Sequence, residues 1–279
     1  MSTGEAAKRL VGVRRFEPGV QMALIVGAAF LYFGVRGLTE GNESLAVANG
    51  LDLLAFERRI GIAVEADLQA FILDRHWAVT AANWVYIWGH WPVIALTLVW
   101  LHRTRRLDYL LLRNALFLSG AIGLLIFMLH PVAPPRLLPG GFTDTVTELS
   151  SSYRILQPPS LVNKYAALPS LHVGWNLLIG LALVRTGANR FTTVVGWLSP
   201  PAMVAAVVVT GNHYVIDAVV GSAVALTGLG VSYRLTPALA LRPVLQRRMD
   251  ISSSAPRLAP APTDLGTTVY QPRSTHSWR

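Results

Sequence analysis

The feature that most constrains this chain is a series of long apolar runs, with most of the charged residues in the segments between them. A helix needs about 20 mostly apolar residues to cross the hydrocarbon core of a membrane. Charged residues make up 14% of the chain, against about 25% in soluble proteins. We therefore predict an all-α integral membrane protein, a six-helix bundle within residues 20–234. The six predicted spans are Val20–Val35, Trp77–Leu101, Leu110–Leu129, Leu171–Val184, Phe191–Val209 and His213–Tyr233.

The segments outside these spans differ in character. Residues 1–19 are basic and form a predicted cytoplasmic N-terminal segment. Leu45–Leu73 mixes apolar residues at helical spacing with charged ones, which is typical of amphipathic helices at the membrane interface. A small extramembrane cap is the alternative. Residues 235–279 are rich in Pro, Ser, Thr and Arg, so we expect a largely disordered cytoplasmic tail.

The basic residues favour one orientation of the predicted bundle. Lys and Arg are more numerous in the segments that lie on the side of the N-terminus, and cytoplasmic loops accumulate these residues. Both termini are therefore expected in the cytoplasm, and the plasma membrane is the expected location. The net charge of +9 follows from these arginines. We therefore expect a membrane as the partner and no binding of nucleic acid. The chain has no cysteine, which excludes disulfides and thiolate chemistry.

Three polar segments fall on the same, extracytoplasmic side of the predicted bundle. They are His130–Pro139, Ala166–His172 and Thr210–Asp217. In the last of them, His213 and Asp217 are four residues apart and are expected on one face of a helix. A carboxylate that holds one ring nitrogen leaves the other nitrogen to attack phosphorus or to accept a proton. A structural His–Asp pair that stabilises the bundle is the alternative.

The other two segments supply groups suited to phosphate. Ser170 and the first backbone amides of a helix could bind a phosphate oxygen, and His172 could protonate a leaving alkoxide. Arg136 follows a proline-rich turn, and its planar guanidinium suits bidentate phosphate contact. Lys164 is a second, weaker candidate cation. Contact with lipid headgroups is the alternative for His172 and for Arg136.

The remaining histidines have no acidic residue at metal-ligand spacing. They are His76, His90, His102 and His130. We therefore predict no metal and no cofactor.

Together these motifs resemble the type 2 phosphatidic acid phosphatase superfamily, and in particular a branch similar to inositol phosphorylceramide synthases. The resemblance rests on Ala133–Arg136, Pro169–His172 and His213–Asp217 within the helical body. It implies that His213 forms a phosphohistidine, that Asp217 orients it, that His172 protonates the leaving group and that Arg136 binds phosphate. It implies no metal.

The chain departs from the phosphatase pattern at four positions. Leu129 and Val207 stand where the pattern has a lysine and an arginine, and Leu137 and Leu171 replace a proline and a glycine. Two cations are therefore missing, which favours the synthase-like branch.

The resulting prediction is a lipid phosphatase or phosphotransferase that cleaves a phosphate ester of a lipid, with transfer of a headgroup such as phosphoinositol to a lipid alcohol as one version. Hydrolysis of a polyprenyl or glycerolipid phosphate is the alternative version. A membrane scaffold or transporter without catalysis is a further alternative.

Overall fold

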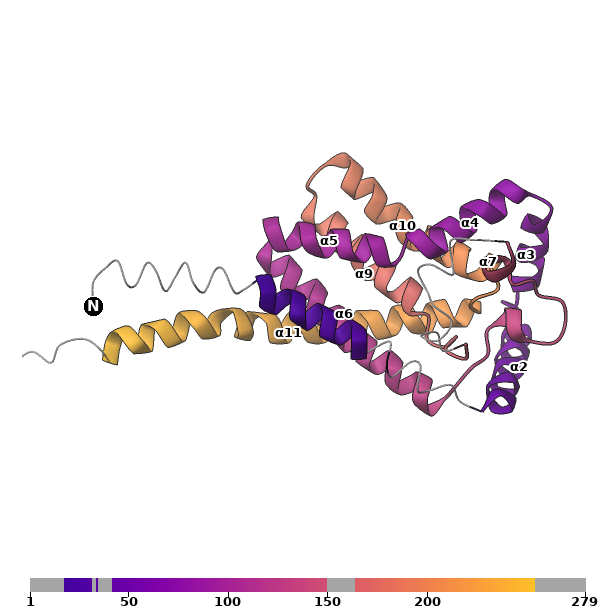
Figure 1. Cartoon of the computed structure of the whole chain (residues 1–279), viewed down its shortest axis with the longest axis horizontal. Coiled ribbons are helices and arrows are strands. Elements are labelled where there is room, and N and C mark those ends of the chain that lie inside the picture. The colour runs from indigo at the N-terminus through magenta and orange to yellow at the C-terminus, as the bar shows by residue number, and fades with distance from the viewer. Residues whose placement is uncertain (1–17, 32–33, 35–41, 150–163, 254–279) are drawn as a thin grey trace, which may run out of the picture. The chain divides into compact units, whose positions relative to one another are not determined.

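The computed structural model describes residues 18–31, 34, 42–149 and 164–253, and it describes side chains up to residue 236. The described residues up to 239 belong to one compact unit. Over the described residues the secondary structure is helical, with one isolated bridge between Val132 and Ala166 (Figure 1). The helices are Pro18–Leu31, α2 (Glu43–Ile60), α3 (Glu65–Leu73), α4 (His76–Trp88), α5 (Trp91–Thr104), α6 (Arg106–Leu129), η1 (Pro135–Leu137), α7 (Thr145–Glu148), α9 (Leu171–Thr186), α10 (Arg190–Val209) and α11 (Val215–Ser253).

Three helices in the described residues are long and apolar enough to cross a membrane. They are α6, α10 and the part of α11 from Val215 to Thr236. The pair α4 and α5 counts as a fourth candidate span if it is taken as one broken helix. The helices Pro18–Leu31 and α9 are apolar but shorter. The structure thus supports an integral membrane protein with three or four candidate spans, fewer than the six that hydropathy predicts.

The predicted span Trp77–Leu101 is not one continuous helix. Its two halves, α4 and α5, meet at an angle of 45° around Gly89 and His90. The break has a local cause, because Pro92 lacks the N–H that a helix interior requires and restricts the backbone of the residue before it. A hydropathy average does not register this interruption.

Helix α9 packs closely against two neighbours through glycines. A side chain at Gly180 would meet the backbone oxygen of Gly196 in α10, and one at Gly174 would meet the backbone oxygen of Gly221 in α11. Apolar side chains of α5, α6 and α9 form the largest buried cluster, which includes Leu116 and Ile179. These close contacts fix the N-terminal end of α9 beside the start of α11.

The segment that we predicted as interfacial forms two helices, α2 and α3, as expected. Asn42 caps α2 by accepting hydrogen bonds from the Ser44 and Leu45 amides, and Gly61 ends the helix with φ of 76°. Two acidic side chains, Glu57 and Glu65, are fully buried and do not lie on a polar surface.

The C-terminal helix extends further than the sequence suggested. We expected a tail from residue 235, but α11 continues to Ser253, and the rest of the predicted tail lies outside the described residues. The helix contains Pro237 and Pro243, two of the prolines in the composition from which we predicted the tail. Residues 1–17 of the predicted N-terminal segment also lie outside the described residues.

Candidate active site

The three polar segments of the sequence meet in space. The Val132 amide donates to the Tyr165 carbonyl (2.8 Å), and the Arg136 amide donates to the Gly211 carbonyl (2.9 Å). The Ser170 amide donates to the backbone carbonyl of Asp217 (3.0 Å). Because these are main-chain contacts, the segments are held together by the backbone itself. A polar pocket between them is lined by Arg136, Lys164, His172, Asn212 and His213, together with Tyr86 and several apolar residues.

His213 and Asp217 lie close together, but not because both are on one helix. His213 precedes α11, which begins at Val215, whereas Asp217 lies in the first turn of that helix. The Asp217 carboxylate accepts a hydrogen bond from the Tyr214 amide (2.9 Å), one of the helix-terminal amides that lack a partner within the helix. This cap folds the chain back and brings the carboxylate to His213.

The hydrogen bonds of His213 select its tautomer. Nδ1 lies 2.8 Å from the Ala167 carbonyl oxygen and 3.3 Å from Oδ2 of Asp217. Both partners are acceptors when Asp217 is ionised, so Nδ1 carries the hydrogen and donates it. Nε2 then has the lone pair of the neutral ring. The ring is 5% exposed and lines the pocket.

Arg136 brings a largely buried positive charge to the pocket. Its side chain is 9% exposed, and Nε lies 3.5 Å from Oδ2 of Asp144. Among the described residues, Nε and Nη1 have no hydrogen-bond partner although both atoms are buried. Buried guanidinium donors without a partner are costly, and their planar arrangement suits an oxyanion.

His172 lies in a stack of aromatic rings. Its ring centroid is 4.5 Å from that of Tyr86, near the C-terminal end of α4, and 4.1 Å from that of His90, which lies between α4 and α5. The distance to the ring centroid of His213 is 5.9 Å. Asn176 connects the same parts, because its amide donates to the carbonyls of Gly89 and His172. Sequence reasoning missed Tyr86 and His90. The only available signal was the interruption at Gly89–Pro92, beside which His90 lies.

Of the other two expected phosphate ligands, Lys164 and Ser170, only Lys164 lines the pocket. Lys164 is exposed and lines the pocket. Ser170 is fully buried, its hydroxyl caps α9 by accepting from the Val173 amide (3.4 Å), and it is not among the pocket-lining residues. The hydroxyl therefore stabilises the start of the helix that carries His172.

Two buried carboxyl groups next to the site were also missed. Oε1 of Glu57 accepts from the Ile216 amide (2.7 Å), and Oε1 of Glu65 accepts from the Val215 amide (3.0 Å). In the sequence they read as the polar face of interfacial helices, and no local pattern marks them as buried. Within the described parts of the chain, no group of three or more His, Asp and Glu side chains is arranged to hold a metal ion.

The apolar helices make this chain an integral membrane protein with a site of histidine, aspartate and arginine between its helices. A family model described as the PAP2 superfamily matches residues 51–231, which is more than half of the chain. The chain therefore belongs to the PAP2 superfamily, and this membership makes it a phosphatase-type enzyme. The match covers the site from Arg136 to Asp217 but does not single out a branch of the superfamily. No curated protein and no solved structure matches the chain.

Proposed function

We propose that this protein cleaves a phosphate ester of a membrane lipid through a phosphohistidine on His213. The observation that carries the proposal is the pairing of a His213 ring, whose Nδ1 hydrogen is held by Ala167 and Asp217, with a buried Arg136 guanidinium in one pocket. The Nε2 lone pair attacks phosphorus while the bond from phosphorus to the lipid oxygen breaks. Arg136 and Lys164 bind the phosphate oxygens, and Asp217 stabilises the phosphorylated imidazolium.

His172 has the role of the acid in this proposal. A protonated His172 ring gives its proton to the departing lipid oxygen. The neutral ring then takes a proton from water, or from an alcohol, whose oxygen attacks the phosphohistidine and releases Nε2 of His213. The stacking of His172 between Tyr86 and His90 supports this role, because it restricts the ring to one orientation.

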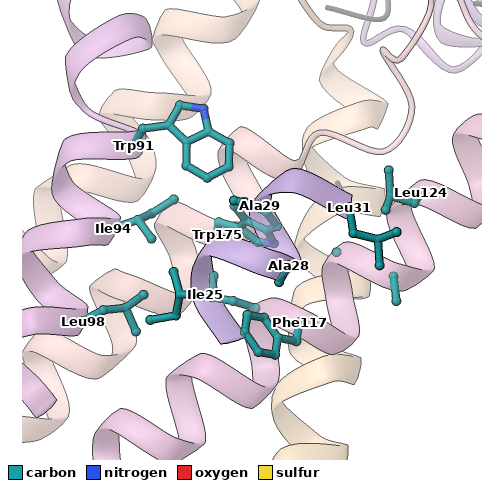
Figure 2. A pocket seen from close by; sticks show the side chains of 13 residues that line it. Ile25, Ala28, Ala29, Leu31, Trp91, Ile94, Leu98, Phe117, Leu124 and Trp175 are labelled. Atoms are coloured by element: carbon teal, nitrogen blue, oxygen red, sulfur yellow. The ribbon is translucent and has the colours of Figure 1, made fainter. Parts of the chain in front are cut away.

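An apolar pocket supports a lipid as the substrate. It has a cavity volume of about 310 Å³ and lies between the helix Pro18–Leu31 and helices α5, α6 and α9 (Figure 2). Trp175 and Leu124 line it, and they lie about one helical turn from Leu171 and Phe127, which line the polar pocket. A phosphate bound near His213 would thus leave a hydrocarbon chain within reach of this cavity.

One observation favours transfer of a phosphodiester group over hydrolysis of a phosphate monoester. The positions of the two cations missing from the phosphatase pattern hold Leu129 and Val207, and Val207 is fully buried among apolar residues. A phosphate monoester carries nearly two negative charges at neutral pH, whereas a phosphodiester carries one. Among the described residues that line the pocket, Arg136 and Lys164 are the only arginine and lysine. This suits the smaller charge, as in a phosphoinositol-type headgroup that passes to a lipid alcohol.

The test uses purified protein in mixed lipid–detergent micelles with a panel of labelled lipid phosphates and phosphodiesters. We expect phosphate release or headgroup exchange, together with an acid-labile label on the protein. The variant His213→Ala should lose both signals, whereas His76→Ala, which removes an exposed histidine of α4, should keep both. Full activity in His213→Ala would refute the mechanism. Release without exchange would leave hydrolysis as the reaction.

We also propose that the site faces the outside of the cell membrane and that both termini are cytoplasmic, on the basis of the Lys and Arg distribution. The absence of cysteine makes this simple to test. Lys164→Cys, at the pocket, should react with a membrane-impermeant maleimide in intact cells. Arg105→Cys, at the exposed junction of α5 and α6, should react only after the cells are opened. The reverse pattern would invert the orientation.

A further inference from the structure

Glu57 in α2 and Glu65 in α3 are carboxyl groups buried without a cation. They are 0% and 1% exposed. Among the described residues, no lysine or arginine forms an ion pair with either of them. Burial of an unpaired charge is costly, so a carboxyl group in this setting is kept neutral or is held by several hydrogen bonds. The structure shows hydrogen bonds to one place only, the start of α11.

The start of α11 is held by three carboxyl groups at three consecutive amides. Asp217 accepts from the Tyr214 amide (2.9 Å), Glu65 from the Val215 amide (3.0 Å) and Glu57 from the Ile216 amide (2.7 Å). These amides have no partner within the helix, and the helix dipole favours negative charge at this end. The three bonds therefore fix the backbone immediately after His213.

We propose that Glu57 and Glu65 are positioning residues for His213 and that the two carboxyl groups share one proton in the active protein. Neither group touches the polar pocket, so they act through the backbone of α11. If the turn from Tyr214 to Asp217 shifts, the Asp217 carboxylate moves away from Nδ1 of His213. The inference deepens the function proposed above and rests on it for its activity measurements.

The evidence for a shared proton is the placement of the two buried carboxyl groups at consecutive amides. Glu57 and Glu65 accept from two consecutive amides, those of Ile216 and Val215, so both carboxyl groups lie at the same turn of the backbone. Two carboxyl groups can hydrogen-bond to each other only when one of them is protonated. The remaining oxygen of each group, Oε2, is buried and has no hydrogen-bond partner among the described residues. One proton between these groups satisfies both.

The surroundings of Glu57 support retention of that proton at neutral pH. Burial raises the pKa of Glu57 to about 8, and the neighbouring carboxyl groups of Glu65 and Asp217 act in the same direction. The bond from the Ile216 amide opposes this shift. The Tyr214 phenol also faces these groups and stays neutral, because burial raises its pKa as well. Above about pH 8 the proton is lost, and Glu57, Glu65 and Asp217 repel one another.

The decisive variant is Glu57→Gln. The amide oxygen can accept the Ile216 hydrogen and the NH₂ group can donate to Glu65, so this side chain mimics the protonated acid. The wild type should lose kcat as the pH rises past about 8, with KM little changed. Glu57→Gln should keep kcat within about twofold at pH 7 and should not show this alkaline loss. Asp52→Asn, at an exposed position of α2, should retain the wild-type profile.

A second variant, Glu57→Ala, removes the bond to α11. We expect kcat to fall by about tenfold or more, as for the loss of a hydrogen bond to a charged group. An unchanged pH profile in Glu57→Gln, or an unchanged kcat in folded Glu57→Ala, would overturn the proposal.

Two further measurements need no substrate and so separate this inference from the proposed reaction. A carboxyl group whose pKa is higher in the folded than in the unfolded state stabilises the fold most at pH values below the unfolded pKa of 4.5, and this stability declines up to about pH 8. Thermal unfolding should show this decline in the wild type and a smaller one in Glu57→Gln. In NMR spectra of the seven labelled histidine rings, the His213 signal should shift in Glu57→Ala and not in Asp52→Asn. An unshifted His213 signal, or equal slopes of stability, would reject the positioning role even if no lipid is turned over.

Discussion

The hydrogen on Nδ1 of His213 determines which ring nitrogen can react. Two acceptors, the Ala167 carbonyl and the Asp217 carboxylate, surround Nδ1, and the carbonyl alone could hold the same tautomer. The distinctive contribution of Asp217 is therefore its charge, which stabilises the imidazolium that forms on phosphorylation.

The variant Asp217→Asn tests this division of roles. The asparagine oxygen can still accept from the Tyr214 amide, so the variant should fold with little change in Tm. Without the charge, kcat should fall by about 10²- to 10⁴-fold. Steady-state kinetics and the amount of phosphorylated protein in a burst experiment measure the loss. A loss below about tenfold would show that the Ala167 carbonyl suffices.

Arg136 allows a second prediction at the same scale. The variant Arg136→Lys keeps the positive charge but loses the planar guanidinium group. A lysine side chain has no donor at the position of the buried Nη1 atom. We expect KM to rise by about 10- to 100-fold, the equivalent of one charge-assisted hydrogen bond. The measurement is kcat and KM for the best lipid of the panel. Asp144→Asn, which removes the carboxylate next to Arg136, should lower KM, because the substrate then has no internal competitor.

Some residues at and near the pocket could be predicted from the sequence and others could not. His172, His213 and Arg136 belong to short motifs with a chemical signature, and the structure places them together. Glu57 and His90 carry no such signature. Their burial depends on partners far away in the chain, the Ile216 amide for Glu57 and the ring of His172 for His90.

At the scale of the helices, the contact between α9 and α11 keeps His172 and His213 near each other. A side chain at Gly221 would lie 2.1 Å from the backbone oxygen of Ser170, whereas one at Gly230, also in α11, would meet nothing within 4 Å.

These two glycines form a matched pair for a stability test. Gly221→Ala should lower the free energy of unfolding by about 1–3 kcal/mol and reduce activity, because the start of α9 must move away. Gly230→Ala should be neutral or stabilising by up to about 1 kcal/mol, because alanine is the better helix former. Thermal unfolding in detergent and lipid turnover measure both. Equal effects at the two positions would show that the close contact does not hold the site.

Hydropathy located the helices better than it defined their ends. Each of the six apolar runs is mostly helical over its described residues, because apolar runs of this length have few other ways to satisfy their backbone. The bend between α4 and α5 escaped prediction, since Pro92 acts on a few residues and the average covers many. The continuation of α11 to Ser253 was not predicted either. The composition after residue 235 is typical of loops, but an existing helix can add residues at little cost.

At the scale of the whole compact unit, the proposed enzyme needs the polar and apolar pockets at once. Filling the apolar cavity should therefore affect substrates according to their chain length. Ala28→Phe places a ring in the cavity, and Ala23→Phe, on the same helix outside it, is the control. KM for long-chain lipid phosphates should rise by about tenfold or more in Ala28→Phe only, by analogy with the burial of one apolar side chain. Short-chain analogues should be unaffected. Equal behaviour of the two variants would remove this cavity from substrate binding.

The bonds from Glu65 and Glu57 to the start of α11 span 150 and 159 residues of chain. Contacts of such long range form late, because the intervening chain must first be ordered. During synthesis, α2 and α3 are made well before residues 215 and 216, so both carboxyl groups lack these hydrogen-bond donors until then. The reactive turn therefore cannot form before residues 213–217 have been synthesised, and a chain that stops earlier has helices but lacks His213 and its supporting bonds.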